Sequence, residues 1–348
     1  MKQIKFSVVI PTYNTETYIE KCIQSVLLQN YKNIQIVVVD DGSTDSTKDI
    51  LKRLRQIYPQ ILVISKPNGG LGSARNTGVR YVDSDYFMFL DSDDYILDGC
   101  FNELEQILKK KWYDIVSFNL YTSNDGTKIN TVQEMNAGYR GEHNATKEKE
   151  ILQIPTLSVC KMYKTSWYKE NTFQFLEGIL YEDVSLVPYM ISKATSIYMI
   201  GTPYYVYYQR AQSIMHRQVD RKMLDIMETM NYCRKLFENS DTYNYYFNEI
   251  EYIAVCTVLF QVTEMINAAN YKNKLQNILI DFMKSEYKNG YHNKYLNKYQ
   301  KKRAKFLYQK RFKDYFYRYT IKRILKTKLR DIMPASIYYL CSQIKKGL

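Results

Sequence analysis

The sequence lacks the cysteine patterns of a zinc site or a disulfide framework. Its six cysteines are scattered, and no two of them form a CxxC pair. They are Cys22, Cys100, Cys160, Cys233, Cys256 and Cys341. This usage excludes both kinds of cysteine site and is typical of a protein in a reducing cytoplasm.

Long apolar runs are also missing. No segment approaches the ~18 consecutive apolar residues that a membrane-spanning helix needs. The start, MKQIKFSVVIPTYN, has neither the long apolar core nor the small-residue cleavage site of a signal peptide. We therefore expect a first β-strand there and a chain without a spanning helix.

Glycine is absent where a dinucleotide-binding enzyme would need it. Such enzymes place GxGxxG directly after their first strand. Here that position holds PTYNTE, and the later GGLGS follows a third strand and gives only GxxG. The spacing excludes a nicotinamide-dependent dehydrogenase of the Rossmann type.

Acidic residues are scarce at one end of the chain only. From Lys294 to Leu348 there are 17 Lys and Arg against Asp314 and Asp331, a balance of +15. The whole chain carries +13, which leaves the residues before Lys294 with about −2. The basic character therefore belongs to this tail and carries no information on the rest of the protein.

Apolar runs and helical spacing alternate over the first 120 residues, which predicts a mostly parallel sheet covered by helices on both faces. Strands are expected at 5–13, 33–43, 60–68, 86–94 and 113–121, and helices at 14–29, 44–58, 72–83 and 100–111. Residues 122–145 read as a loop or exposed hairpin, 158–171 and 181–194 as helices, 196–201 and 203–210 as strands, and about 220–288 as helical throughout.

Polar clusters follow four of the expected strands. They are PTYN at 11–14, DDGS at 40–43, KPNGG at 66–70 and DSDD at 91–94. In parallel sheets ligands bind beyond the carboxyl ends of the strands. The four clusters are therefore expected to converge on one crevice.

The acidic cluster contains Asp91, Asp93 and Asp94. One interpretation is a solvated turn in which Asp94 or Ser92 caps the next helix. The other is a site for Mg²⁺ or Mn²⁺, which prefer oxygen ligands and leave part of their shell to water and substrate phosphate. A nucleotide diphosphate bound at the other strand ends would supply those remaining ligands, so we favour the metal site.

The other clusters also allow two interpretations. Asp40 and Asp41 either cap a helix or accept hydrogen bonds from base N–H groups and ribose hydroxyls. Arg75 and Asn76 belong to NGGLGSARNTG, residues 68–78, and are either exposed at the start of a helix or close to the phosphate or base of a ligand. The second interpretation is favoured by the backbone N–H groups at the start of a helix and by the guanidinium, which both attract anions.

These segments together resemble family 2 glycosyltransferases with the GT-A fold. The resemblance is carried by FSVVIPTYNTETYIEKCIQSVLLQNYKNIQIVVVDDGSTDST, then NGGLGSARNTG and FMFLDSDD, and covers about the first 215 residues. It implies that Asp40 holds uracil, that Asp91 lies near the ribose or sugar, and that Asp93 binds the metal. It also directs attention to GILYEDVSLVPYM, where it implies that Asp183 is the catalytic base next to Glu182. Without the resemblance, these two acids would be assigned to the first turn of a helix, where they complement the dipole.

YYVYYQRAQSIMH resembles the family segment that closes over the diphosphate. His216 is expected there as a further metal ligand beside Asp91 and Asp93. The residues expected to bind the nucleotide sugar are Pro11, Thr12, Tyr13, Asn14, Glu16, Asp40, Asp41, Asn68, Gly70, Arg75, Asp91, Ser92, Arg210 and Ser213.

The resemblance implies an inverting transfer from a UDP-sugar to a hydroxyl of a glycan acceptor, expected to be linked to polyprenyl diphosphate. Asp183 would take the hydroxyl proton, and Mn²⁺ or Mg²⁺ would stabilise the departing nucleoside diphosphate. One base opposite one metal fits a single displacement.

We expect three segments: a catalytic domain at 1–218, a helical domain at 219–293 and a basic, aromatic, helical tail at 294–348. Apolar stripes beside lysines and arginines predict that the tail binds an anionic membrane surface, which would place the protein on the cytoplasmic face of the membrane. The alternative is a helical appendage that packs on the body or on a second subunit of a homodimer. Nucleic acid is the weaker candidate partner.

Two other functions compete with this one. A sugar nucleotidyltransferase also pairs carboxylates with Mg²⁺, but PTYNTE does not resemble the glycine-rich opening of that class. A catalytically silent scaffold that acts through its tail is opposed by the intact Asp40, Asp91, Asp93 and Asp183.

Overall fold

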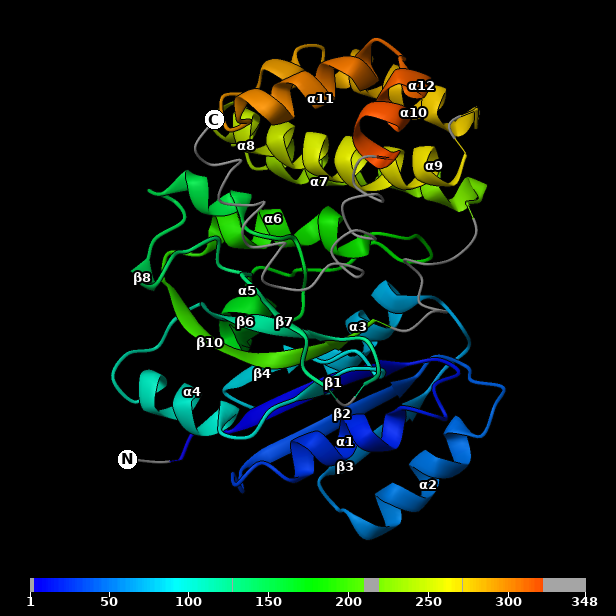
Figure 1. The fold of residues 1–348 in the computed structure, drawn as a ribbon. Helices are drawn as coiled ribbons and strands as arrows, with labels where there is room; N and C mark the ends of the chain where they lie inside the picture. Colours follow the sequence, from blue (N-terminus) through cyan, green and yellow to red (C-terminus); the bar gives the residue numbers. More distant parts are fainter. Residues whose placement is uncertain (1–2, 127, 210–218, 271, 322–348) are drawn as a thin grey trace, which may run out of the picture. The chain divides into compact units, whose positions relative to one another are not determined.

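The computed structural model describes residues 3–126, 128–209, 219–270 and 272–321. Contacts group the chain into two compact units (Figure 1). The first comprises residues up to 218 together with 228–250, and the second comprises 219–227 and the residues from 251 onward. The expected division into three segments, 1–218, 219–293 and 294–348, stays a prediction.

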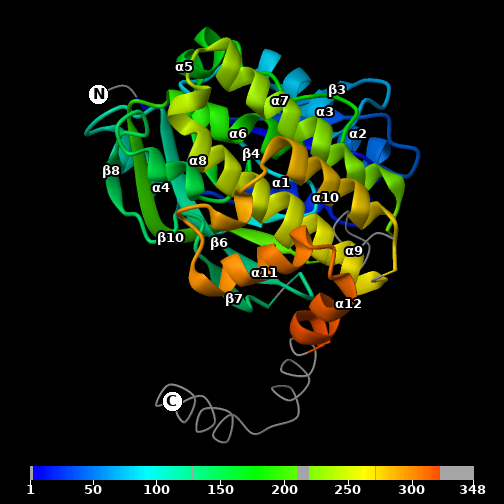
Figure 2. The ribbon, with the colours of Figure 1, turned by 90° about the horizontal axis from the view of Figure 1, so that it is seen from above.

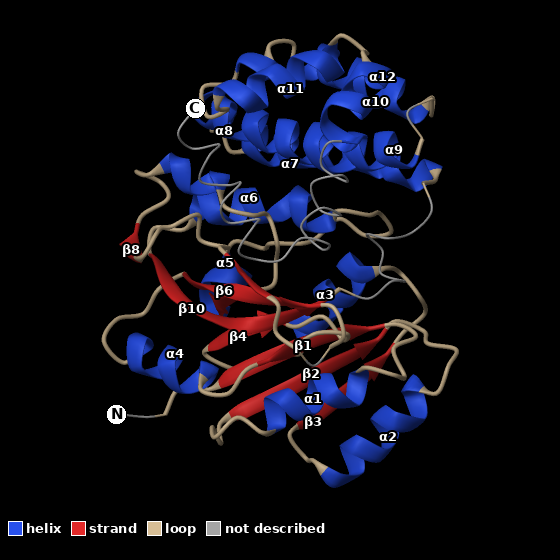
Figure 3. Cartoon of the chain, viewed as in Figure 1, coloured by secondary structure: helices blue, strands red, loops and turns tan. Residues whose placement is uncertain are grey.

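The first unit is built on one mixed β-sheet (Figure 3). The strand order is β3-β2-β1-β4-β9-β6-β10-β5, with β7 paired to β6 and β8 paired to β10. β1 is parallel to β2 and β4, β2 to β3, and β6 to β10, whereas β9 runs antiparallel to both of its neighbours. The strands are β1 (Phe6–Thr12), β2 (Ile34–Asp40), β3 (Ile61–Ser65), β4 (Tyr86–Phe89), β5 (Tyr95–Ile96), β6 (Ile115–Ser123), β7 (Thr131–Gln133), β8 (Gly141–His143), β9 (Lys161–Lys164) and β10 (Ile197–Tyr208).

Helices follow the first strands as the sequence predicts. They are α1 (Ile19–Leu27), α2 (Thr47–Ile57), α3 (Leu71–Arg80) and α4 (Cys100–Leu108). All seven residues of β1 are buried, which explains its mostly apolar sequence. Gly78 faces β1, where a Cβ atom would collide with the side chain of Val9, so a glycine lets α3 pack closely on the strand.

Two predictions for the middle of the chain were wrong. Residues 158–171 were expected to be helical, but they contain β9 and only a short helix, α5 (Thr165–Glu170). β9 is buried on both faces, and a short apolar run of this kind has the same pattern in a strand and in a helix. The strands expected at 196–201 and 203–210 form one long strand, β10, whose register shifts at Pro203.

Helices complete the first unit. They are the 3₁₀ turn η1 (Lys149–Gln153), α6 (Glu182–Lys193), and residues 228–250 of α7 (Asp225–Asn239) and α8 (Tyr243–Ala254). The ring centroid of Phe237 lies 5.3 Å from that of Tyr189 on α6 and 5.5 Å from that of Tyr246 on α8. α6, α7 and α8 therefore lie side by side, as both ribbon views show (Figures 1 and 2).

The second unit is helical in its described residues, as predicted for 220–288 and for the start of the tail. It contains η3 (Arg221–Leu224), the π-helical η4 (Val255–Thr263), α9 (Glu264–Ala269), α10 (Leu275–Glu286), η5 (Gly290–His292), α11 (Lys298–Tyr308), α12 (Phe312–Tyr315) and the π-helical η6 (Phe316–Ile321). Glu264 on α9 pairs with Arg303 on α11 and accepts from the hydroxyl of Tyr315 on α12, which fixes three helices together. The last 27 residues of the predicted tail, 322–348, lie outside the described residues.

One continuous helical run bears on the expectation that no helix spans a membrane. Tyr243–Ala269 has 27 residues and a mean hydropathy of 1.4 in its most apolar window, enough to cross a membrane by length and composition. However, 61% of that window is buried within the protein. The core helix of a globular protein has the same properties, so the run is weak evidence for a membrane span.

Candidate active site

Strand register brings the ends of β1, β2 and β3 into line. Thr12 pairs with Asp40, and Asp40 with Ser65. The N–H of Leu90, which precedes the acidic cluster, donates to the carbonyl of Val9 on β1 at 3.0 Å. The four polar clusters therefore leave the same edge of the sheet, as expected.

Side chains connect the loops after β1 and β2. Asn14 Oδ1 accepts from the N–H of Thr44 at 2.8 Å, and the N–H of Asn14 donates to Ser43 Oγ at 3.0 Å. Glu16 accepts from the N–H of Ser46 at 2.8 Å. Asn14 and Glu16, expected to bind the donor, thus already hold two loops in place.

The remaining residues of the first cluster differ in exposure. Pro11 and Thr12 are buried in β1, and Thr12 Oγ1 lies 2.5 Å from Thr15 Oγ1. Tyr13, by contrast, is 48% exposed. Of these three side chains, Tyr13 is therefore the one able to stack on a bound base or sugar.

Asp40 is fully buried, and its carboxylate is only half satisfied. Oδ1 accepts from the N–H of Ser43 at 2.9 Å. Oδ2 has no hydrogen-bond partner among the described residues, although it is buried. Buried polar atoms are nearly always paired, so this oxygen leaves room for a donor such as a water or the N–H of a bound base.

Asp41 has a different environment. Its carboxylate accepts from the N–H groups of Gly69 and Gly70 at 3.0 and 2.8 Å and from Lys66 Nζ at 2.5 Å. Asn68 Nδ2 donates to the carbonyl of Asp41 at 3.0 Å, and Gly70 takes a φ of +85°, which favours glycine. Asp41, Asn68 and Gly70 thus shape the 66–70 loop, and their contact with the donor stays a prediction.

We expect Asp41→Ala to lower the free energy of unfolding by about 2–4 kcal/mol, because two amides and a partly buried ammonium would lose their acceptor. Urea unfolding measures this loss. Asp83→Ala is the matched control, since the side chain of Asp83 is 86% exposed in its pair with Lys5 and its removal should leave the transition unchanged. Equal transitions for both variants would contradict the structural role of Asp41.

The acidic turn after β4 is closed by hydrogen bonds. The N–H of Asp94 donates to the carbonyl of Asp91 at 3.0 Å. The buried carboxylate of Asp94 accepts from the Tyr205 hydroxyl at 2.5 Å and from the N–H of Tyr208 at 2.8 Å. Neither Asp94 nor Ser92 caps a helix, since α4 begins only after Gly99.

Asp91 and Asp93 are the carboxylates of this turn that fit a metal. Burial raises the pKa of Asp91, as does the charge of Asp93, and the Arg75 guanidinium opposes both effects. A divalent cation would relieve this repulsion, and carboxylate oxygens suit Mg²⁺ and Mn²⁺. No group of three His, Cys, Asp or Glu within the described ranges could hold a metal by itself. The expected third ligand, His216, lies outside those ranges.

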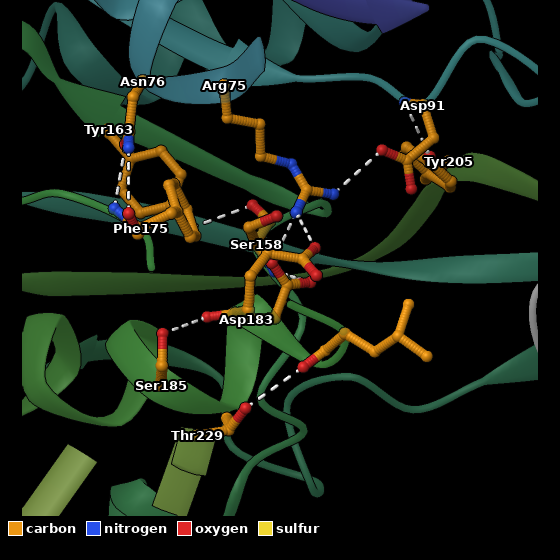
Figure 4. A network of polar contacts seen from close by, with 12 residues as sticks. Arg75, Asn76, Asp91, Ser158, Tyr163, Phe175, Asp183, Ser185, Tyr205 and Thr229 are labelled. Atoms are coloured by element: carbon orange, nitrogen blue, oxygen red, sulfur yellow. Dashed lines mark hydrogen bonds and ion pairs between the residues drawn. The ribbon is translucent and has the colours of Figure 1, made fainter. Parts of the chain in front are cut away.

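Arg75 on α3 lies at the centre of the site (Figure 4). Its guanidinium binds Asp91 at 3.0 Å, Asp183 at 2.7 Å and also Glu182. The side chain is only 1% exposed. Burial alone would lower the pKa of Arg75, but the three carboxylates reverse this effect and raise it. The guanidinium of Arg75 is thus bound to three carboxylates, and its expected contact with phosphate or base stays a prediction.

The residue after Arg75 holds the adjoining segment. Asn76 Nδ2 donates to the carbonyl of Phe175 and to Glu177 Oε1, each at 2.9 Å, and its Oδ1 accepts from the N–H of Phe175 at 2.8 Å. The two neighbouring residues of α3 therefore fix both ends of the segment that leads to Asp183.

Asp183 lies in the first turn of α6, as the helical interpretation of the sequence predicts. Besides Arg75, it accepts the N–H of Ser158 on Oδ2 at 3.0 Å, and its side chain is 15% exposed. Each oxygen thus keeps a lone pair, and a small part of the side chain is exposed to solvent. Glu182 is more deeply buried, and burial together with the charge of Asp183 raises its pKa while Arg75 opposes the rise.

Three expected donor and metal residues, Arg210, Ser213 and His216, lie outside the described residues. Sequence patterns missed Ser158 and Tyr205, which hold Asp183 and the acidic turn. Recognising β9 as a strand would have directed attention to the turn before it that contains Ser158. For Tyr205, no local signal distinguishes it among the tyrosines of β10.

Known proteins resemble this chain in sequence and in fold. The profile of glycosyl transferase family 2 matches residues 7–171. An uncharacterized glycosyltransferase of Mycoplasma pneumoniae is 30% identical over 211 residues, which are 58% of this chain and 67% of that protein. Glycosyltransferase GlyA of Streptococcus pneumoniae is 29% identical over 236 residues, which are 65% of this chain. Those residues are 34% of GlyA, so this chain spans about a third of that relative.

A crystal structure of S. aureus TarS 1–349 in complex with UDP-GlcNAc superposes with a TM-score of 0.71 at 22% identity, covering 90% of this chain and 89% of that one. At this identity the likeness concerns the fold alone.

Proposed function

Because this chain belongs to glycosyl transferase family 2 and has the GT-A fold, we propose that it transfers a sugar from a UDP-sugar to a hydroxyl of a glycan acceptor, with inversion at the anomeric carbon. The acceptor would be part of a cell-wall or other surface polysaccharide or a glycolipid. Among the relatives, a minor teichoic acid biosynthesis protein of Bacillus subtilis is 34% identical over 154 residues, which supports this class of product.

The observation that carries the proposal is the pair of carboxylates on the Arg75 guanidinium. Asp91 and Asp183 come from two distant segments, yet one buried side chain binds both of them. The side chain of Asp91 is 29% exposed and that of Asp183 is 15% exposed, so each has an open side. This arrangement supports a sugar held by Asp91 within reach of a base, Asp183.

Each residue then has a distinct task. The unpaired oxygen of Asp40 would accept the base N–H, and Tyr13 would cover the base or sugar. Asp91 would accept hydroxyls of the ribose or sugar. Asp183 would accept the proton of the acceptor hydroxyl as that oxygen attacks C1, because it is the more exposed carboxylate of the Glu182-Asp183 pair.

Asp93 and Asp91, together with His216, would hold Mn²⁺ or Mg²⁺. When bound, such a cation supplies charge stabilisation to the leaving nucleoside diphosphate. Arg75 meanwhile keeps Asp91 in place through its contact with Oδ1.

We place the protein on the cytoplasmic face of the membrane, with an acceptor linked to polyprenyl diphosphate. The described start of the tail supports contact with anionic lipid, because Tyr299 and Tyr317 are 58% and 53% exposed among exposed cations such as Lys302 and Lys305. A homodimer held by the tail is the alternative use of the same surface.

The test of the proposed function is hydrolysis of a panel of sugar nucleotides with Mn²⁺ or Mg²⁺ and then with EDTA, with released nucleotide diphosphate as the readout. We expect metal-dependent release from one UDP-sugar, which also identifies the donor. If the protein hydrolyses none of the sugar nucleotides and does not bind UDP, the proposed enzymatic function is refuted. Vesicle binding by the same protein would then favour a silent scaffold that acts through its tail.

A further inference from the structure

Lys161 is a buried lysine that the proposed reaction does not yet use. It begins β9 in the middle of the sheet and is 1% exposed. Its ammonium donates to the carbonyl of Leu157 at 2.7 Å, and no carboxylate of the described residues lies within ion-pair distance. We infer that Lys161 is a positioning residue that directs the Ser158 amide at Asp183, an inference that rests on the proposed role of Asp183 as base.

The link from Lys161 to Asp183 runs through a single peptide group. The carbonyl of Leu157 and the N–H of Ser158 belong to the same planar unit, and in a trans peptide they point in opposite directions. Lys161 binds the oxygen, and Asp183 Oδ2 accepts the N–H at 3.0 Å. A fixed carbonyl therefore fixes the direction of the N–H that holds the base.

The next carbonyl of the turn is held in a similar way. Tyr163, two residues after Lys161 on β9, donates its hydroxyl to the carbonyl of Ser158 at 2.9 Å (Figure 4). Residues two apart on a strand share a face, so one face of β9 supports both carbonyls. The turn ends at Cys160 with a φ of +62°, a conformation that costs a non-glycine residue energy and that the surrounding contacts must maintain.

The charge of Lys161 adds to this geometry. An ammonium on a carbonyl polarises the peptide and strengthens the N–H as a donor. Burial lowers the pKa of Lys161 to about 8, while the charge of Asp183 opposes the shift. A methionine of similar length would fill the same space without this desolvation cost. Support of the turn thus gives the buried cation a task that an apolar side chain could not perform.

Lys161→Met tests the inference in the full-length protein, with the donor and acceptor of the wild-type enzyme. We expect kcat to fall by about 10- to 100-fold, because a small misplacement of the base is costly, while KM for the donor changes less than about twofold. Lys164→Met is the matched control: Lys164 ends the same strand, and its ammonium lies 5.9 Å from the Trp112 ring, away from the turn. That variant should keep its kcat.

A combined variant separates positioning from general damage. If Lys161 acts through Asp183, then Lys161→Met added to Asp183→Asn should cost no more than about threefold beyond Asp183→Asn alone. A further tenfold loss, or an unchanged kcat in Lys161→Met, would overturn the inference. Should Lys161→Met not bind UDP, Lys161→Gln carries the same test, since it removes the charge from the turn but keeps a polar side chain there.

The outcomes also separate this inference from the proposed function. An inactive wild-type protein, or a fully active Asp183→Asn, would refute the reaction or its base. An active wild type with an impaired Asp183→Asn and a normal Lys161→Met would refute only the role of Lys161.

Discussion

Asp183→Asn is expected to lower kcat for sugar transfer by about 10²- to 10⁴-fold and to change binding of the UDP-sugar by less than about threefold. The amide cannot accept the proton of the attacking hydroxyl. Neither Asp40 nor the acidic turn contacts Asp183 directly, so the donor should still bind. Steady-state transfer rates and calorimetric titration with UDP measure the two quantities separately.

The substitution also disturbs the local hydrogen bonds. The carboxylate accepts from Arg75 on one oxygen and from the Ser158 N–H on the other, whereas an amide has only one acceptor. A stability loss of about 1–2 kcal/mol should therefore accompany the loss of rate. Asp49→Asn is the control, because Asp49 is also a first-turn helix acid, on α2, but exposed. A kcat for Asp183→Asn within tenfold of wild type would exclude Asp183 as the base.

The first half of the sheet could be predicted because its signals are local. β1 and β2 are mostly apolar runs that end in polar clusters, and their parallel pairing places Thr12 opposite Asp40. The convergence of strand ends follows from the topology alone. The tasks of the individual side chains could not be predicted in this way. Asp40 and Asp41 are neighbours in DDGS, yet the fold leaves Asp40 with an unpaired oxygen and directs Asp41 to the 66–70 loop.

The central part of the site could not be predicted because its contacts span long distances in sequence. Arg75 meets its partners Glu182 and Asp183 more than 100 residues away, and local pattern indicated only an arginine near the start of a helix. The Glu-Asp pair itself was found through family resemblance, since two acids at a helix start are common. Ser158 was hidden by the incorrect assignment of 158–171, where β9 is too short for its period to be recognised.

Arg75→Met is expected to lower the free energy of unfolding by about 3–5 kcal/mol and to abolish transfer, the largest combined effect of the variants considered. The guanidinium is the cation that Asp91, Glu182 and Asp183 share, and without it three carboxylates would repel one another in a largely buried site. Arg75→Lys should recover little, because a point charge cannot reproduce the fork that bridges separate carboxylates. Urea unfolding and transfer assays give both effects.

The same argument predicts how the defect of Arg75→Met depends on pH and on Glu182. Without the cation, the pKa values of the carboxylates in the folded state rise above their unfolded values, so the folded state binds more protons and gains stability as the pH falls. The variant should therefore be closer to wild type at about pH 5 than at about pH 8. Adding Glu182→Gln removes one of the repelling charges and should restore part of the stability, but not the transfer, since Asp91 and Asp183 remain unbridged. Arg80→Met, an exposed arginine at the end of the same helix, should show none of this. If Arg75→Met unfolds like wild type at both pH values, electrostatic repulsion does not govern the stability of the site. The main role of Arg75 would then be the contact with the donor that the sequence indicates.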